Sequence, residues 1–348
     1  MNPKSIFASE ITEQPMAMQR LIELEDTNIK NVASVIRGHA PRFIMLVARG
    51  SSDNAARYGQ YVFSAFNKLP VALATPSLFT IYRQPPNLQD VLVISVSQSG
   101  QSPDLLAVME SARDQGAMTI SITNSPESPL AQLSEFCIHL QAGEEKSVAA
   151  SKSYTNSLLA LALLSTHLAE DPVRKNEIIR IPEILAGVLP KMDNILTRAA
   201  EDRQSQAAVV IGRGFNYSTA FEIALKLKEL TYLLAEPYSS ADFKHGPVAT
   251  VQNGFLVIAV IPEGKVANEL TNFMLELKLN APRLIIISPI KQALELASYP
   301  ISIPCGIPEW LSPLVAVVPG QMYALGLALA RGIDPDHPRG LGKVTLTN

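Results

Sequence analysis

The sequence has few of the residues that build metal centres and disulfide frameworks. It contains two cysteines, Cys137 and Cys305, and five scattered histidines, with neither a CxxC pair nor an HExxH motif. Each cysteine lies in a short apolar run, so we expect two buried free thiols rather than a metal site or a disulfide. A Walker lysine and a GxGxxG motif are also missing, which argues against a nucleotide cofactor. We expect no metal and no cofactor.

Long runs of one charge are equally absent. The formal net charge is -3 and no basic stripe occurs, which argues against nucleic acid as the main partner. The N-terminus has no apolar signal core. The most apolar stretch, residues 311–330, contains Pro313, Pro319, Gly320 and Gln321, and it predicts a buried helix or a strand plus helix rather than a membrane span. These features predict a cytoplasmic protein.

What is abundant is apolar sequence, and it repeats. Hydrophobic residues make up 47% of the 348 residues, enough for a large core and two domains. The run FIMLVARG ends at Gly50 and AVVIGRG ends at Gly214, an offset of 164 residues. The pairs VLVISV with FLVIAV and CIHL with ISIP keep the same offset. We interpret this spacing as two copies of one fold.

Within each copy, short Val/Ile-rich runs alternate with helical patterns, for example at residues 53–67, 104–115 and 219–234. Continuous apolar strands separated by helices are typical of a parallel sheet covered on both faces. We therefore predict an α/β protein made of two doubly wound parallel-sheet domains, with ligand sites at the carboxyl ends of the strands. The predicted organisation is an N-terminal segment 1–30, a first domain 31–170, a second domain 195–330 and a tail 331–348.

Serine clusters follow two strands of the first copy. One strand ends at Arg49-Gly50-Ser51-Ser52, and another ends in the loop from Ser97 through Gln98 and Ser99 to Ser102. Ser102 is a good N-cap and Pro103 fits the first helical position, so hydroxyls and free N–H groups would converge on one helix N-terminus. That geometry suits a phosphate dianion. The alternative is a serine-rich turn that only caps a helix.

The second copy has lost these hydroxyls, because its equivalent loop reads Ile261-Pro262-Glu263-Gly264. It carries Glu222, Lys226 and Glu229 instead, at i, i+4 and i+7, on one face of a helix. A solvated helix face with ordinary ion pairs is the alternative interpretation. His245 lies in a loop bounded by glycine and proline, which favours a functional role.

Several segments together resemble the SIS (sugar isomerase) family, and within it the isomerase half of glutamine–fructose-6-phosphate aminotransferases. They occur in the family's order along nearly the whole chain: RGSS, SQSGQS, VAASKSYT, ALKLKEL, FKHGP and the tail from Asp336 to Thr345. The resemblance implies two flavodoxin-like SIS domains and a small sugar phosphate as ligand. It also implies a homodimer, in which His245 reaches the neighbouring subunit's site.

The resemblance also implies roles for single residues. Ser52, Ser97, Gln98, Ser99 and Ser102 match the family's phosphate binders, beside Ser51. Glu229 matches its base for proton transfer between C1 and C2, His245 its ring-opening histidine, and Lys343 its tail lysine that engages the open-chain sugar. Glu222 and Lys226 match supporting residues, and Val148 a substrate-contacting backbone position. The tail 331–348 would close the active site.

No glutaminase segment precedes the isomerase-like part, so we expect the reaction to release ammonia, as in SIS-type glucosamine-6-phosphate deaminases. The resemblance leaves other hypotheses open. They are a fructosamine-6-phosphate deglycase, an aldose–ketose phosphosugar isomerase, a non-catalytic sugar-phosphate sensor, and an isomerase subunit served by a separate glutaminase.

Overall fold

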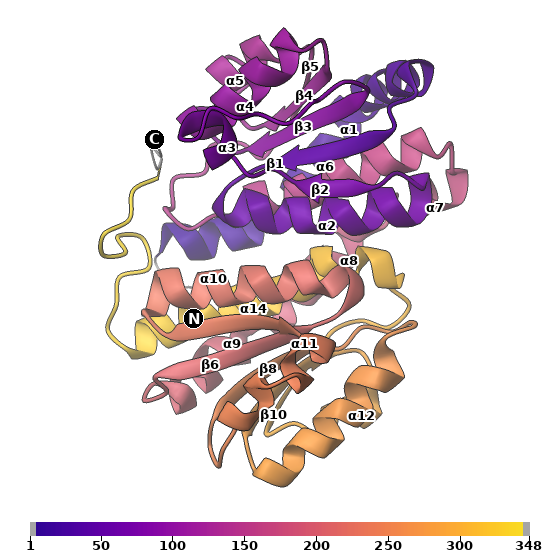
Figure 1. The fold of residues 1–348 in the computed structure, drawn as a ribbon. Coiled ribbons are helices and arrows are strands. Elements are labelled where there is room, and N and C mark those ends of the chain that lie inside the picture. Colours follow the sequence, from indigo (N-terminus) through magenta and orange to yellow (C-terminus); the bar gives the residue numbers. More distant parts are fainter. Residues whose placement is uncertain (1–4, 344–348) are drawn as a thin grey trace. The chain divides into compact units, whose positions relative to one another are not determined.

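The computed structural model describes residues 5–343, apart from the side chains of residues 191 and 193. Two five-stranded sheets form its framework (Figure 1). The strand order is β2-β1-β3-β4-β5 in the first sheet and β7-β6-β8-β9-β10 in the second. Every described pairing is parallel. The predicted pair of doubly wound α/β domains is confirmed, and each has the flavodoxin-like order.

The first sheet belongs to a unit whose described residues are 13–146, 150–182 and 342–343, called here the first unit. The long helix α1 (Ile6–His39) enters it from residue 13 onward. Its other elements are β1 (Phe43–Val47), α2 (Gly50–Asn67), β2 (Val71–Leu73), α3 (Ser77–Thr80), β3 (Val91–Ser97), α4 (Pro103–Asp114), β4 (Met118–Thr123), α5 (Pro129–Leu133), β5 (Phe136–His139), α6 (Lys152–Leu168) and α7 (Pro172–Ile179).

The second sheet belongs to the second unit, whose described residues are 5–12, 147–149 and 183–341. The linking helix α8 (Ile181–Val188) leads into it. Its other main elements are α9 (Asp193–Arg198), β6 (Ala207–Gly212), α10 (Tyr217–Thr231), β7 (Leu234–Ser239), α11 (Ser240–Lys244), β8 (Leu256–Val260), α12 (Ala267–Leu277), β9 (Arg283–Ser288), α13 (Lys291–Leu294), β10 (Tyr299–Ser302) and α14 (Ser312–Ala330).

The two units repeat the same packing as well as the same strand order. In the first, α2 packs along the nearly fully buried helix α6, and in the second α10 packs along the equally buried α14. Figure 1 shows α4 and α5 on the opposite face of the first sheet from α2 and α6. Both faces of each parallel sheet are thus covered, which explains why the strands read as continuous apolar runs.

The most apolar stretch of the chain forms one continuous helix, α14, which passes through Pro319 without ending. It belongs to the one segment of the described residues that is long and apolar enough to cross a membrane, and 89% of that window is buried inside the structure. Such burial is typical of a core helix, so the prediction of a buried helix is confirmed.

The prediction of buried thiols needs correction. Both cysteines are free, but Cys137 is only half-buried and Cys305 is exposed. Cys137 lies on β5, an edge strand, and Cys305 follows β10, the edge strand of the other sheet. The apolar runs that contain these cysteines belong to strands at the sheet edges, where neighbouring elements cover less of each side chain.

Candidate functional site

The two serine clusters of the first unit lie at neighbouring strand ends. β1 pairs with β3 in parallel, so the segments after Val47 and after Ser97 leave the same edge of the sheet. The strand order reverses between these two strands, and this is where open α/β sheets form a crevice for ligands. An ion pair of 2.6 Å between Arg49 and the buried Asp104 ties the two segments together.

The loop after β3 is built to present backbone and hydroxyl groups. Ser102 is the N-cap of α4 and Pro103 occupies the first turn, as predicted, but the Ser102 side chain makes no capping bond. The buried Ser97 Oγ accepts the Gly100 N–H at 3.1 Å, which curls the loop. Gly100 has φ +63°, and a Cβ there would lie 2.1 Å from the Ser128 Oγ, so only glycine fits. Gln98, Ser99 and Ser102 remain half-buried.

Asn124, at the end of β4, connects this loop to the segment before α6. Its backbone N–H donates to the Gln98 carbonyl at 3.1 Å. Its side chain donates to the Gly143 carbonyl at 2.8 Å and accepts the Ala142 N–H at 3.0 Å. Gln98, Asn124 and residues 143–145 also line one pocket of about 400 Å³. The first unit therefore contains a polar pocket beside the predicted phosphate loop.

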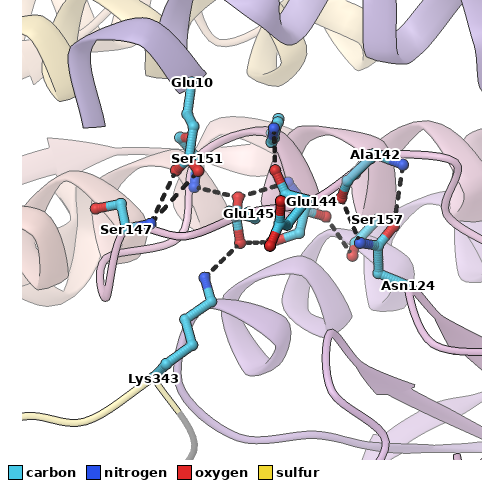
Figure 2. A network of polar contacts seen from close by, with 12 residues as sticks. Glu10, Asn124, Ala142, Glu144, Glu145, Ser147, Ser151, Ser157 and Lys343 are labelled. Carbon is cyan, nitrogen blue, oxygen red and sulfur yellow. Dashed lines mark hydrogen bonds and ion pairs between the residues drawn. The ribbon is translucent and has the colours of Figure 1, made fainter. Parts of the chain in front are cut away.

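Lys343 lies against a carboxylate that the sequence did not single out. Its Nζ is 3.0 Å from Oε2 of Glu145, whose side chain has no exposed area (Figure 2). The pKa of Glu145 is affected by burial, which alone would raise it. The Lys343 ammonium and hydrogen bonds from Ser153 and Ser151 outweigh that effect, so the pKa is lowered. Glu145 is therefore ionised at neutral pH.

In the second unit, α10 carries the three charged residues predicted to share a face. Lys226 is fully buried, with its Nζ 2.5 Å from Glu229 Oε2 and 3.4 Å from Glu222 Oε1. Glu222 is also fully buried, while Glu229 keeps 22% of its side chain exposed. The alternative of a solvated face with ordinary surface ion pairs is wrong, because two of the three charges are withdrawn from water.

The electrostatics of this cluster favour a protonated lysine. Burial alone would lower the pKa of Lys226, but the carboxylates of Glu222 and Glu229 raise it well above its ordinary value. Two carboxylates around one ammonium leave the cluster with a net negative charge. Glu229 is the member that solvent or a ligand can reach.

His245 and Val148 also belong to the second unit. His245 is exposed, directly after α11, with its backbone N–H bonded to the Asp242 carbonyl. Val148 is half-buried in the short segment 147–149, where the Ser147 N–H donates to the Glu10 carboxylate at 3.3 Å. Of the motif's tail, residues 344 and 345 lie outside the described residues.

Three residues that hold the loops of the first unit in place were not predicted from the sequence. They are Asp104, Asn124 and Glu145. Their signal was weak, because each follows or precedes a motif without belonging to a recognisable spacing. For Glu145 the available hint was a carboxylate six residues before the N-cap of a buried helix. Among residues 5–343, no group of three or more His, Cys, Asp or Glu side chains is arranged to hold a metal ion.

Comparison with known proteins connects this geometry to a family. The family model of the SIS domain matches residues 40–167 and again residues 203–331. The chain is 35% identical, over 344 residues, to the glutamine–fructose-6-phosphate aminotransferase of Thermococcus kodakarensis, covering 96% of this chain and 56% of that protein. It spans about half the length of the curated relatives it matches.

Solved structures agree with this assignment. The C-terminal domain of the glucosamine-fructose-6-phosphate aminotransferase of Francisella tularensis superposes with a TM-score of 0.87 at 27% identity, covering 96% of this chain and 98% of that one. The glucosamine-6-phosphate deaminase of Thermotoga maritima shares the fold, with a TM-score of 0.78 at 23% identity and coverages of 99% and 100%. The chain therefore belongs to the SIS domain family, as a homologue of the isomerase half of glutamine–fructose-6-phosphate aminotransferases.

Proposed function

We propose that this chain is a phosphosugar isomerase that converts glucosamine 6-phosphate and water to fructose 6-phosphate and ammonia. The observation that carries the proposal is the cluster on α10. A buried ammonium, Lys226, holds two carboxylates in place, and only Glu229 is partly exposed. Such an arrangement provides a fixed carboxylate base that a substrate can approach.

The serine loops supply the other requirement of a phosphosugar enzyme. In the first unit, half-buried Ser51 and Ser52 begin α2, and Ser99 and Ser102 precede α4. Hydroxyls and free N–H groups at helix N-termini are suited to a phosphate dianion. The protein as a whole is weakly acidic, so these local donors, rather than a broad positive field, would bind the phosphate.

The reaction follows from these parts in balanced steps. His245 assists ring opening, which exposes the C1 aldehyde of glucosamine 6-phosphate. Glu229 removes the C2 proton, and the electron pair moves toward the C1 carbonyl oxygen, which takes up a proton from water to give a C1–C2 enolamine. Glu229 returns its proton, or one exchanged with water, to C1, and the C2 amino group releases a proton to water, which leaves an imine at C2 and a hydroxyl at C1. Water adds to that imine and ammonia departs, giving fructose 6-phosphate. Lys343 would hold or polarise the open chain, and a Schiff base is one form of that contact.

The direction of the reaction follows from the chemistry of ammonia. Free ammonia is mostly protonated at neutral pH and is then not a nucleophile. Loss of ammonia from the aminosugar needs only water, whereas gain of ammonia needs a source that delivers it unprotonated. The similarity to aminotransferases of fructose 6-phosphate supports the substrate pair, and the activity assay decides the direction.

The first experiment measures ammonia and fructose 6-phosphate released from glucosamine 6-phosphate by the purified protein. We expect Glu229→Gln to lower kcat by about 10²–10⁴-fold, since it removes the general base but keeps the shape. Binding of the phosphosugar, followed by calorimetry, should survive. Glu236→Gln is the matched control, because Glu236 is 62% exposed on the adjacent strand β7. Normal turnover by Glu229→Gln would overturn the assignment of the base.

A panel of substrates separates the alternatives. Interconversion of glucose 6-phosphate and fructose 6-phosphate without ammonia would identify a plain aldose–ketose isomerase. Release of a free amino acid from a fructosamine 6-phosphate would identify a deglycase. Binding without turnover of any sugar would identify a sensor, and activity that appears only with a co-purifying glutaminase would identify a synthase subunit.

A further inference from the structure

The segment between β5 and α6 contains an ionised carboxylate with no exposed surface, Glu145. Its Oε1 accepts the backbone N–H groups of Ser151 and Ser153, each at 3.0 Å. Its Oε2 accepts the Ser153 hydroxyl at 2.6 Å and the Lys343 ammonium at 3.0 Å (Figure 2). A buried charge is stable only when it is fully hydrogen-bonded, and both oxygens meet that condition.

Glu145 also replaces the cap of a long helix. Ser151 occupies the N-cap of α6 but makes no capping bond with its own side chain. The Glu145 carboxylate takes the free N–H groups there and places a negative charge at the positive end of a 17-residue helix. The helix N-terminus and the Ser153 hydroxyl therefore stabilise the ionised carboxylate independently of Lys343.

Because Glu145 has this separate support, the contact with Lys343 can open and close. Lys343 keeps 27% of its side chain exposed, whereas its partner has none. If the ammonium moves away, three hydrogen bonds and the helix N-terminus still support the carboxylate. The pair is thus an attachment that can open without leaving an unsupported buried charge, unlike an isolated buried salt bridge.

The attachment point borders the pocket beside the phosphate loop. Residues 143–145 and Gln98 line the same cavity of about 400 Å³. Asn124 holds the two walls together through its bonds to Gln98, Ala142 and Gly143. An ammonium bound at Glu145 is therefore presented within the first unit, next to the segment that would bind the phosphate.

We propose that Glu145 is the positioning residue for Lys343, keeping its ammonium docked at this pocket for the open-chain carbonyl of the substrate. The role given to Lys343 rests on the proposed function. The docking of Lys343 by Glu145 does not, and it can be measured without any substrate.

The docking test measures how fast each lysine of the folded, full-length protein reacts with N-hydroxysuccinimidyl acetate at pH 7, using mass spectrometry. We expect Glu145→Gln to raise the rate at Lys343 by about tenfold, the size expected for losing a hydrogen bond to a charged group. Glu144→Gln is the matched control, because Glu144 is 76% exposed and its carboxylate pairs with Lys146. An equal rate at Lys343 in wild type and Glu145→Gln would overturn the proposal.

Ser153→Ala distinguishes specific pairing from a general loosening of α6. It removes the Ser153 hydroxyl from Glu145 but keeps the carboxylate, so Lys343 should stay protected. If Ser153→Ala raises the acetylation rate at Lys343 as much as Glu145→Gln does, a general loosening of α6 explains the effect and the proposal fails. Glu145→Asp is the replacement variant if Glu145→Gln does not fold, because it keeps the negative charge on a shorter side chain. We expect its acetylation rate at Lys343 to lie between those of wild type and Glu145→Gln. A wild-type rate would contradict the proposal.

Enzyme kinetics provide a second test of the proposal. With an active enzyme, Glu145→Gln should lower kcat while the KM for the phosphosugar changes little, because the phosphate loop is untouched. Glu110→Gln, on the exposed side of α4, is the control for that assay. An unchanged kcat would remove the catalytic part of the proposal. If the wild type turns over no phosphosugar, the proposed function fails, while the acetylation rates still decide whether Glu145 docks Lys343.

Discussion

At the scale of single residues, burial distinguishes Lys226 from an ordinary surface lysine. Lys226 and Lys228 are two residues apart on α10, and both pair with glutamates. Lys226 is fully buried between two carboxylates, while Lys228 is 40% exposed and lies 3.8 Å from its partner Glu236. Exposed pairs contribute little to stability, but breaking a buried pair leaves an uncompensated charge.

This contrast predicts the effect of Lys226→Met. We expect it to lower the free energy of unfolding at pH 8 by about 3–5 kcal/mol, because two carboxylates then remain close together without a counter-charge. Urea unfolding followed by circular dichroism measures the change. Lys228→Met should cost less than about 1 kcal/mol.

The pH dependence of that loss has a definite sign. Without the lysine, the two carboxylates of Glu222 and Glu229 repel each other in the folded state, and protonation at lower pH relieves this repulsion. The destabilisation by Lys226→Met should therefore be smaller at pH 5 than at pH 8. An equal or larger loss at pH 5 would contradict the electrostatic explanation and favour a packing defect.

At the scale of elements, a residue of the C-terminal tail caps the first helix of the chain. The Asp336 carboxylate accepts the N–H groups of Ile6 and Phe7, at 2.8 and 2.9 Å, and the Ser5 hydroxyl accepts the Ala8 N–H at 3.1 Å. These bonds satisfy three of the free donors at the start of α1. Part of the tail motif therefore has a structural role, distinct from that proposed for Lys343.

We accordingly expect Asp336→Ala to lower the free energy of unfolding by about 0.5–2 kcal/mol, the usual cost of removing a capping side chain. Asp336→Asn keeps an acceptor and should cost clearly less. Chemical unfolding of the two variants, with hydrogen exchange at Ile6 and Phe7, tests the cap. Equal stability of Asp336→Ala and wild type would show that the cap is dispensable.

At the scale of the whole molecule, the two copies of the fold have diverged in their loops. In the first unit, the loop after β3 presents serines. In the second, the loop after β8 has lost them, and the backbone N–H of Lys265 already donates to the Glu309 carboxylate at 2.5 Å. A protein carboxylate thus occupies a donor that the repeat would otherwise offer to a ligand. Phosphate binding is expected in one copy and proton transfer in the other.

A prediction about the assembly follows from the exposed position of His245. If this ring serves the site of a second copy in a homodimer, Glu229→Gln and His245→Ala are inactive alone but complement each other after mixing and reassembly. Each mixed dimer then has one intact site, so about a quarter of wild-type activity should return. No recovery, with mixed dimers verified by mass spectrometry, would show that His245 acts within its own chain.

Much of the fold was predictable because its signals are local and repeated. The strands are continuous apolar runs at a constant offset, and a parallel sheet buried on both faces requires such runs. The start of α4 at Pro103 and the shared face of Glu222, Lys226 and Glu229 follow from helix chemistry and the 3.6-residue period. The roles expected for Glu229, His245 and Lys343 came from the family resemblance and remain predictions.

Tertiary structure alone decided the environment of those residues. The sequence by itself determined two doubly wound domains, the serine loops and the charged face of α10, since each depends on neighbours a few residues away. It did not determine that Lys226 is excluded from water, that Glu145 holds Lys343, or that Asp336 caps a helix 330 residues earlier. Burial and pairing between distant segments depend on how the sheets and helices pack. They cannot be predicted from the spacing of residues along the chain.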